Sequence, residues 1–206
     1  MDVVVRTARP QDAADALLFA SAAPYYAAYA CGPERAQRLL HTLYPRRAHT
    51  ASWEVCHVAE ADGEIVGVLA AFPSGEGDAL ARRFVRLTLV HSAPWRIPAL
   101  MRHLRATAAV APRPPERMLY VDALATDSAH RRRGVARALL EEADRIAAAA
   151  GLDGVALDTG IENRAARSLY ERAGFSPSSL RPAPDERIAR AVGGSGFVGY
   201  VKARAN

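Results

Sequence analysis

The stretch HRRRGVARALL, residues 130–140, combines a glycine and small side chains with the apolar spacing of a helix start. Three consecutive arginines precede that helix, and its first acidic residue is Glu141. The N-terminus of a helix is already partially positive and disfavours a cation by about 0.3–1 kcal/mol. A bound anion would neutralise the arginines and the helix end together. The stretch therefore indicates either an anion site or an arginine-rich loop before an ordinary surface helix.

The residues around this stretch predict a strand, a polar loop and a helix in succession. MLYVDALAT at 118–126 is typical of a strand, and 135–150 has the spacing of a helix with one buried face. No GxxxxGK[ST] loop is present, and Gly134 lacks the further glycines of a dinucleotide fingerprint. The loop therefore does not indicate a nucleoside triphosphate or a dinucleotide.

The rest of the chain alternates between strand and helix patterns. Further strands are expected at 3–6, 53–61, 64–72, 154–158, from 175 onward and at 196–203, and further helices at 13–20, 33–44, 79–90 and 162–172. An Asp-Gly pair at 62–63 predicts a hairpin, and 176–195 a polar loop. Without repeats or long linkers, the sequence predicts one layered α/β (α+β) domain over 1–206.

Composition narrows the class of protein further. The chain has 206 residues, of which 50% are hydrophobic and 24% charged, as in an ordinary globular protein. Cys31 and Cys56 form no CxxC pair, so we expect reduced thiols and a cytoplasmic location. The six histidines have no metal-ligand spacing, so no metal is expected. No signal-peptide pattern or long apolar run is present, so no membrane partner is expected.

The net charge of +5 raises the question of nucleic acid as a partner. Lys202 is the only lysine among the 27 basic residues, and the arginines are spread along the chain and mixed with acids. This pattern is typical of a compositional bias toward arginine. We therefore expect no nucleic-acid partner, and nucleic-acid binding through 131–133 is kept only as an alternative hypothesis.

Two short motifs carry a resemblance to a known family. Arg131-x-x-Gly134-x-Ala136 matches the (Q/R)xxGx(G/A) pattern that follows a central strand in the GNAT superfamily of N-acetyltransferases. In NRAARSLYERAGF, 163–175, an Asn is followed seven residues later by Tyr170, and the helix ends in Gly-Phe as in the second signature of that family. The chain resembles the superfamily most specifically over 118–175.

The resemblance implies the GNAT fold. This is a mixed central sheet of about six to seven strands flanked by helices, with a splay between the fourth and fifth strands, here 119–126 and 154–158. The resemblance to the superfamily is looser over 3–72 and weak over 73–116 and 176–206.

Members of this superfamily transfer an acetyl group from acetyl-CoA to a primary amine. By resemblance, the loop amides bind the pyrophosphate, the strand main chain pairs with the pantetheine arm, and an amide near Leu124 could stabilise the oxyanion. Asn163 would contact the pantetheine arm or a water near it. The residues expected to bind acetyl-CoA are Leu124, Ala125, Thr126, Arg131, Arg132, Arg133, Gly134, Val135, Ala136, Arg137, Asn163, Ala166 and Tyr170.

Tyr170 is the expected general acid. CoA leaves as a thiolate that needs a proton, and a phenol with an ordinary pKa near 10 still carries its proton at neutral pH. The alternative is that Tyr170 is a packing aromatic before Gly174 and Phe175.

Asp122 is the expected general base, because an acid within so apolar a strand needs a partner or a purpose. The alternative is a buried Asp122 paired with an arginine. Glu54, Glu60 and Glu64 on the predicted hairpin are reserve bases.

The acceptor amine is not identified by the sequence. Residues 20–50, 73–110 and 176–195 would wall its pocket, and PYYAAY at 24–29 and Trp95 could supply aromatic walls. No acidic cluster in the sequence marks a polyamine pocket. The alternative function is a non-catalytic acyl-CoA-binding module, although such a protein would have no chemical reason to keep Tyr170. The use of longer acyl groups and a homodimer both stay open.

Overall fold

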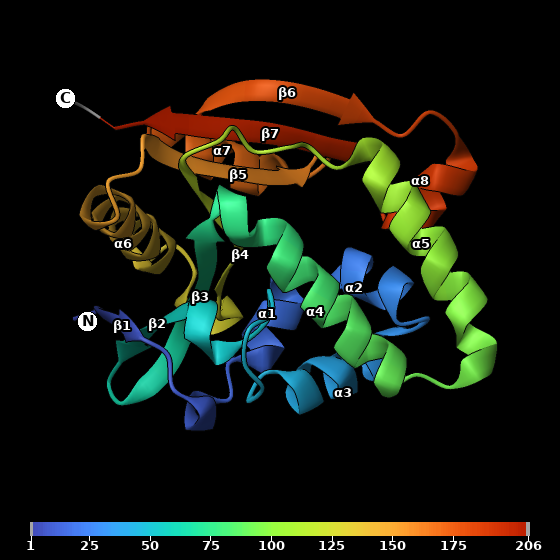
Figure 1. The fold of residues 1–206 in the computed structure, drawn as a ribbon. Helices are drawn as coiled ribbons and strands as arrows, with labels where there is room; N and C mark the ends of the chain where they lie inside the picture. Colours follow the sequence, from blue (N-terminus) through green and yellow to red (C-terminus); the bar gives the residue numbers. More distant parts are fainter. Residues whose placement is uncertain (1, 205–206) are drawn as a thin grey trace.

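The computed structural model describes residues 2–204, in which helices cover both faces of a central sheet (Figure 1). The strands are β1 (Val4–Thr7), β2 (Cys56–Ala61), β3 (Glu64–Pro73), β4 (Met118–Thr126), β5 (Gly154–Gly160), β6 (Ser176–Pro182) and β7 (Gly196–Ala203). The α-helices are α1 (Asp15–Ser21), α2 (Ala23–Tyr29), α3 (Pro33–Leu43), α4 (Gly77–Val90), α5 (Ile97–Val110), α6 (Val135–Ala149), α7 (Arg164–Arg172) and α8 (Glu186–Val192).

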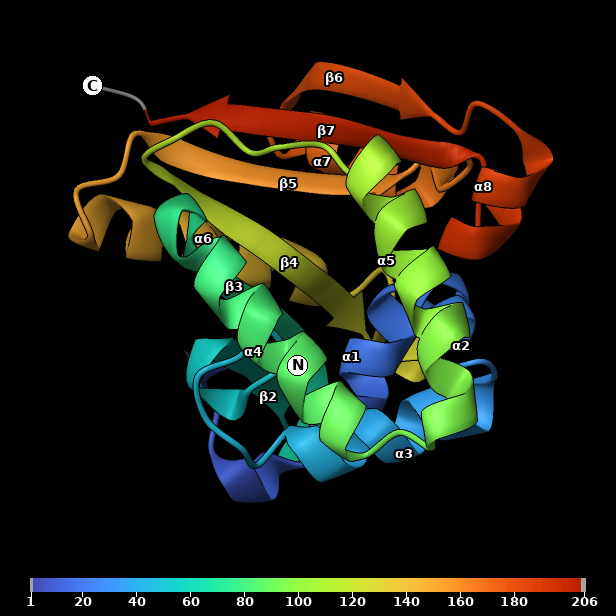
Figure 2. The same ribbon diagram turned by 45° about the vertical axis from the view of Figure 1, so that its right-hand side comes forward.

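The strands of residues 2–204 join in one seven-stranded sheet, in the order β1-β2-β3-β4-β5-β7-β6. Neighbouring strands are antiparallel except β4 and β5, which are parallel. Their pairing runs only from Met118 with Gly154 to Val121 with Leu157. Beyond these residues the strands part, as Figure 2 shows for the far end of β4. The mixed sheet and its splay confirm the predicted GNAT fold.

Side-chain alternation along the strands divides the apolar residues between two cores. On one face Val58 and Val68 pack in a core that includes residues of α1 to α5. On the other face Ala59 and Leu69 pack with residues of α6 and α7. Because successive side chains point to opposite faces, β2 and β3 are buried on both sides, which explains their almost continuous apolar sequence.

A glycine in β3 sets the position of α6. A Cβ atom on Gly67 would lie 2.7 Å from Cγ1 of Val135 and 3.0 Å from Cδ1 of Leu139. A side chain there would push the helix away from the sheet. Gly67 therefore fixes how closely the arginine-bearing start of α6 approaches the strands.

The predicted hairpin between β2 and β3 is confirmed. Asp62 has a φ of 51° and Gly63 a φ of 82°. A two-residue type I′ turn requires positive φ at both positions. The first of the two strands is shorter than predicted, because Trp53–Val55 forms a 3-10 turn in which the side chain of Ser52 accepts a hydrogen bond from the Glu54 amide.

The prediction of a polar loop over 176–195 is wrong. This segment contains the edge strand β6 and the helix α8. Within residues 2–204, β6 has β7 as its only neighbouring strand, and an edge strand tolerates prolines such as Pro177 and Pro182. Asp185 caps α8 by accepting a hydrogen bond from the Ile188 amide at 2.8 Å, and Gly193 ends the helix with a φ of 80°. The tyrosine-rich segment before α3 is also helical and forms α2.

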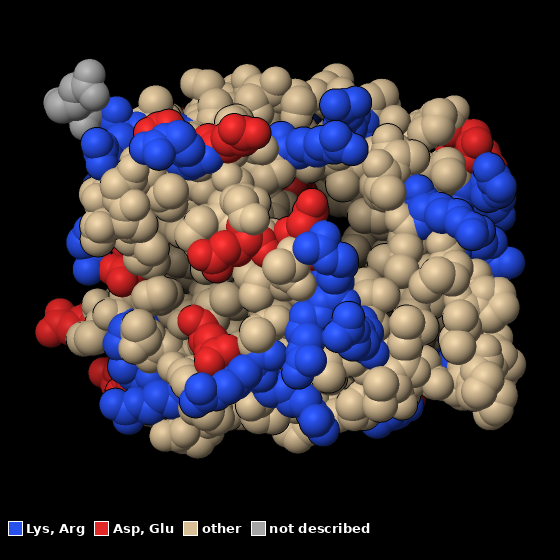
Figure 3. All heavy atoms as spheres, viewed as in Figure 1, with Lys and Arg blue, Asp and Glu red and all other residues tan. Residues whose placement is uncertain are grey.

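Basic side chains do not gather in one area of the face shown in Figure 3. Lys and Arg occupy several separate areas, and Asp and Glu lie between some of them. Within residues 2–204, no helix has the length and apolar character needed to span a membrane.

Candidate active site

Two carboxylates lie at the point where β4 and β5 part. Asp122 and Asp158 are the first residues beyond the last paired ones, Val121 and Leu157. Residues at matching positions of parallel strands point to the same face of a sheet. Past this point β3 pairs with one edge of β4, while the edge toward β5 has no strand partner among residues 2–204. The splay thus exposes both carboxylates and an open strand edge.

The start of α6 presents unpaired backbone amides. Arg132 has a φ of 61° and Gly134, the N-cap, a φ of 88°. Within residues 2–204, the backbone N–H groups from Arg131 to Arg137 have no hydrogen-bond acceptor. A Cβ atom on Gly134 would meet nothing within 4 Å, so the space beside it is open. Successive free amides at a turn and a helix N-terminus form a concavity that favours an anion.

A groove of about 620 Å³ runs from this turn along β4 to α7. Its lining contains Arg131, Arg132, Arg137 and Arg172 and no Asp or Glu. Of the residues expected to bind acetyl-CoA, it includes Leu124, Ala125, Thr126, Arg131, Arg132, Gly134, Val135, Ala136, Arg137, Asn163, Ala166 and Tyr170. Arg133 is not part of the lining, so the structure does not bring this predicted residue to the groove. The roles of the others stay predictions.

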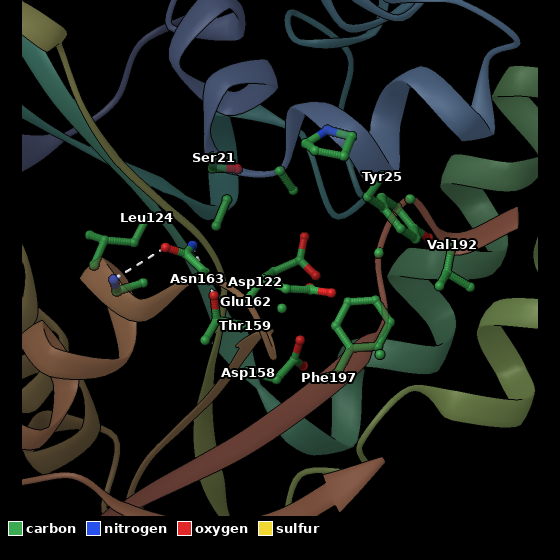
Figure 4. A pocket seen from close by; sticks show the side chains of 18 of the residues that line it. Ser21, Tyr25, Asp122, Leu124, Asp158, Thr159, Glu162, Asn163, Val192 and Phe197 are labelled. Atoms are coloured by element: carbon green, nitrogen blue, oxygen red, sulfur yellow. Dashed lines mark hydrogen bonds between the residues drawn. The ribbon is translucent and has the colours of Figure 1, made fainter. Parts of the chain in front are cut away.

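A second cavity, of about 410 Å³, adjoins the groove and has the opposite charge. Asp122, Asp158 and Glu162 line it, and no Lys, Arg or His does. Figure 4 shows these carboxylates in the middle of the view, with Tyr25, Val192 and Phe197 on one side and Leu124 and Asn163 on the other. A basic groove and an acidic cavity therefore meet at the splay.

The two spaces share part of their walls. Both are lined by Ser21, Leu124, Asn163, Ala166 and Tyr170. The shared residues come from α1, β4, α7 and the residue that caps α7. A molecule in the groove and a molecule in the cavity would meet at these side chains.

Tyr170 lies at this junction on α7 and is 6% exposed. Its ring packs against Phe175 and Tyr200 at centroid distances of 6.0 and 5.8 Å. Its hydroxyl has no hydrogen-bond partner within residues 2–204, although the side chain lines both spaces. Burial, followed by the charge of Asp158 and the phenol of Tyr200, raises the pKa of Tyr170 above its ordinary value. The phenol therefore keeps its proton at neutral pH. Tyr170 is a packing aromatic whose unpartnered hydroxyl opens onto the cavity and the groove.

Asn163 has a local structural role beside the one predicted from the resemblance. Its Oδ1 accepts a hydrogen bond from the Ala166 amide at 3.2 Å and caps α7, and its Nδ2 donates to Thr159 at 3.1 Å. These bonds hold the start of α7 against β5. They also fix the direction of the Asn163 side chain at the junction, where Figure 4 shows both of its bonds.

The pKa values of the paired aspartates are raised. Asp122 faces the open cavity and its side chain is exposed, yet the protein atoms around the cavity reduce the solvation of the carboxylate. This desolvation, followed by repulsion from Asp158, raises the pKa of Asp122 to about 7. Desolvation raises the pKa of Asp158 to about 6, a rise limited by a hydrogen bond of 2.5 Å from the Tyr120 hydroxyl. The two groups therefore ionise in succession around neutral pH.

Within residues 2–204, no arginine pairs with Asp122. The structure therefore does not contain the ion pair that was the alternative interpretation of Asp122. The reserve bases lie elsewhere. Glu54 accepts a hydrogen bond from the Ala48 amide, Glu60 pairs with Arg6, and Glu64 is exposed at the hairpin. None of the three lines the cavity or the groove.

Several residues of the site were not predicted. Asp158 and Glu162 line the cavity, and Phe197 comes from β7. Asp158 carried a usable signal, because it ends an apolar strand and the argument made for Asp122 applies to it equally. Of the aromatic residues expected to wall the acceptor pocket, Tyr25 lies on the cavity wall. Trp95 is 77% exposed and lines neither space.

Replacing Asp122 by Asn is expected to raise the melting temperature. The folded pKa of about 7 lies above the ordinary value of 3.8, so the wild type loses stability as pH rises through that interval and Asp122 ionises. An amide has no charge to desolvate. The gain should therefore be larger at pH 8 than at pH 5, measured by calorimetry. The matched control is Asp153→Asn, which removes a surface carboxylate that pairs with Arg117 at 3.1 Å and should give no such gain. A lower melting temperature for Asp122→Asn at pH 8 would contradict the prediction.

Comparison with solved structures assigns the architecture to the N-acetyltransferases. A solved acetyltransferase is 17% identical, with a TM-score of 0.69, over 98% of this chain and 100% of its own. An N-acetyltransferase from Staphylococcus aureus Mu50 is 16% identical, with a TM-score of 0.66, over 96% of this chain and 98% of its own. An apo agmatine N-acetyltransferase variant is 21% identical, with a TM-score of 0.60, over 98% of this chain and 100% of its own. At these identities the likeness concerns the fold.

A family model supplies the more specific assignment. The model of the acetyltransferase (GNAT) family matches residues 19–175, which include the groove, both aspartates and Tyr170. The chain belongs to the GNAT acetyltransferase family. No curated protein sequence matches the chain.

Proposed function

We propose that the chain is an acetyl-CoA-dependent N-acetyltransferase, a single cytoplasmic domain that acetylates a primary amine. The observation that carries the proposal is the meeting of a basic groove and an acidic cavity at one buried tyrosine, Tyr170. An anionic acyl donor suits the groove, an amine suits the cavity, and the unpartnered hydroxyl lies where the two would react.

The groove fits acetyl-CoA on three grounds. The free amides from Arg131 to Arg137 can donate to a pyrophosphate, and the missing Cβ of Gly134 leaves room for it. Arg131, Arg132 and Arg137 add positive charge around that position. The open edge of β4 at Leu124 to Thr126 can pair with the amide groups of the pantetheine arm as an added strand would.

The residues at the junction would act on the acceptor amine and on the leaving thiolate. The neutral amine nitrogen would form a bond to the carbonyl carbon, and Asp122 would take a proton from that nitrogen as the bond forms. A free amide of β4 near Leu124 would donate to the oxyanion. Tyr170 would give its proton to the sulfur as the carbon–sulfur bond breaks. One proton is gained at Asp122 and one is lost at Tyr170, so the products are an N-acetyl amine and CoA thiol, and exchange with water restores both groups.

Acetyl-CoA is expected to stabilise the protein in a thermal-shift titration. At 100 times its Kd a ligand adds about 2.7 kcal/mol, which corresponds to roughly 5–10 °C for a chain of this size. Arg131→Ala should weaken acetyl-CoA binding. Arg145→Ala is the matched control, because Arg145 lies on α6, the helix that follows the Arg131 loop, pairs with Glu142 and lines neither the groove nor the acidic cavity.

The same titration separates the proposal from its alternatives. No shift with any acyl-CoA would overturn the proposal. A shift without thiol release on a panel of amines would favour the non-catalytic acyl-CoA-binding module. An affinity for nucleic acid that falls steeply with salt and ignores acetyl-CoA would favour nucleic-acid binding.

A further inference from the structure

The acidic cavity contains more negative charge than an amine acceptor alone requires. Asp122 comes from β4, Asp158 from β5 and Glu162 from the turn before α7. None of the three has a salt-bridge partner within residues 2–204. A single ammonium group would need one of them as base, which leaves two further carboxylates without a cation.

Glu162 differs from the two aspartates in its surroundings. It lies on the exposed rim, where its carboxylate accepts hydrogen bonds from the Ser195 amide at 3.2 and 3.4 Å. This bond lowers the pKa of Glu162, so the group stays charged at neutral pH. The aspartates at the splay have raised pKa values, and a cation bound beside them would favour their ionised forms. Glu162 is therefore a fixed negative charge, while the aspartates form a titratable pair.

The remaining walls suit a small cation with an apolar body. Tyr25 and Phe197 line the cavity with aromatic faces, and Val192 adds an aliphatic one. Aromatic faces attract ammonium and guanidinium groups. The Tyr25 ring is held by His103 and Tyr29 at centroid distances of 4.7 and 6.4 Å. At about 410 Å³ the cavity is within the range of small-molecule sites.

The end of α8 closes the cavity on the side of α2. Gly193 has a φ of 80°, and a Cβ atom there would lie 2.6 Å from the carbonyl carbon of Pro24. This close backbone contact between the two segments requires glycine. Both residues line the cavity, so its walls are set by packed backbone.

Tyr170 supplies an independent sign that a ligand belongs here. It is more than nine-tenths buried, and its hydroxyl faces the junction without a partner among residues 2–204. The hydroxyl is therefore a donor that opens onto the cavity and the groove, and an occupant of either space could accept its hydrogen bond.

We propose that the acceptor is a small amine with a second cationic group, of the diamine or aminoguanidine class, with its reactive nitrogen beside Asp122 and its distal cation bound by Glu162. The inference rests on the proposed function and deepens it. The distal cation offsets the fixed charge at the rim, the aromatic and aliphatic walls contact the methylene chain, and the reactive amine lies next to the aspartate pair.

The test compares two amines that differ in one charge, 1,4-diaminobutane and butylamine, by thiol release with acetyl-CoA. The kcat/KM for the diamine should exceed that for butylamine by roughly tenfold or more, about the value of one hydrogen-bonded ion pair. Glu162→Gln keeps an oxygen that can accept from Ser195 but removes the charge. It should remove most of the diamine's advantage over butylamine, through a higher KM for the diamine.

Glu186→Gln is the matched control, because Glu186 is exposed on α8 and lines neither space, so the ratio of the two amines should not change. Equal kcat/KM values for the two amines would overturn the cationic specificity and leave acetyl transfer standing. If no amine releases thiol although acetyl-CoA binds, the proposed reaction fails. The specificity is then tested by calorimetric binding of both amines in the presence of CoA. The proposed specificity is overturned if the diamine binds no tighter than butylamine, or if Glu162→Gln leaves the affinity for the diamine unchanged.

Discussion

Tyr170→Phe is expected to lower kcat by roughly 100-fold, the lower end of the effect of a general acid. The variant removes only the hydroxyl that would protonate the CoA thiolate. Phe fills the same space between Phe175 and Tyr200, and no hydrogen bond within residues 2–204 is lost, because the hydroxyl has no partner there. The fold and the Kd of acetyl-CoA should therefore stay close to wild type.

Steady-state thiol release measures kcat, and a thermal-shift titration measures acetyl-CoA binding. Tyr200→Phe is the matched control for removing a phenol from the same aromatic cluster. Its hydroxyl donates to Glu171 at 3.0 Å and accepts from Arg167 at 3.2 Å, so this variant should lose stability but keep its rate. Turnover of Tyr170→Phe at the wild-type rate would eliminate the general-acid role and leave Tyr170 as a packing residue.

Asp122→Asn is expected to lower kcat/KM at pH 8 by roughly 100-fold and to change its dependence on pH. A general base must be ionised, and desolvation raises the pKa of Asp122 to about 7. The wild-type kcat/KM should therefore rise with pH up to about 7 and then level off. In Asp122→Asn the break near pH 7 should be absent, because no carboxylate titrates at that position.

A second variant makes this test specific to the aspartate pair. Asp158→Asn removes the repulsion that contributes to the raised pKa of Asp122, so the break should move to lower pH while activity above it persists. Tyr120 can still donate to the amide oxygen of this variant. Profiles of kcat/KM between pH 5.5 and 8.5 for the three proteins provide the comparison. Wild-type activity with an unshifted break in Asp122→Asn would dispose of the general-base assignment.

Local patterns predicted much of the fold. The strands at 118–126 and 196–203 were predicted with their observed bounds, and Asp62 with Gly63 form the predicted turn. Each of these depends on neighbours in sequence, through alternation or turn geometry. A strand was expected from 175 onward and β6 begins at Ser176, but the helix α8 within 176–195 was not predicted; it packs against α2 and α5, which are distant in sequence.

The candidate site likewise contains residues that were predicted from the local sequence and residues that were not. Gly134, Asn163 and Tyr170 were predicted from short motifs that resemble those of the GNAT superfamily, and such motifs are local features of the sequence. Arg133 was included with its neighbours, and only the three-dimensional path of the loop separates it from the groove lining. Glu162 had no local signal, since a glutamate before a helix is ordinary.

The sequence by itself determined the class of protein and predicted an anion site at the turn before α6, because helix starts, strand periods and family motifs are properties of neighbouring residues. Only the tertiary structure decided the charge of the cavity at the splay. The sequence shows no acidic cluster, yet Asp122, Asp158 and Glu162 line one cavity. The physical reason is the register of two parallel strands, which brings residues 122 and 158 together at the point where pairing ends. These carboxylates are far apart in the sequence but lie together there, in a space where water does not fully screen their charges.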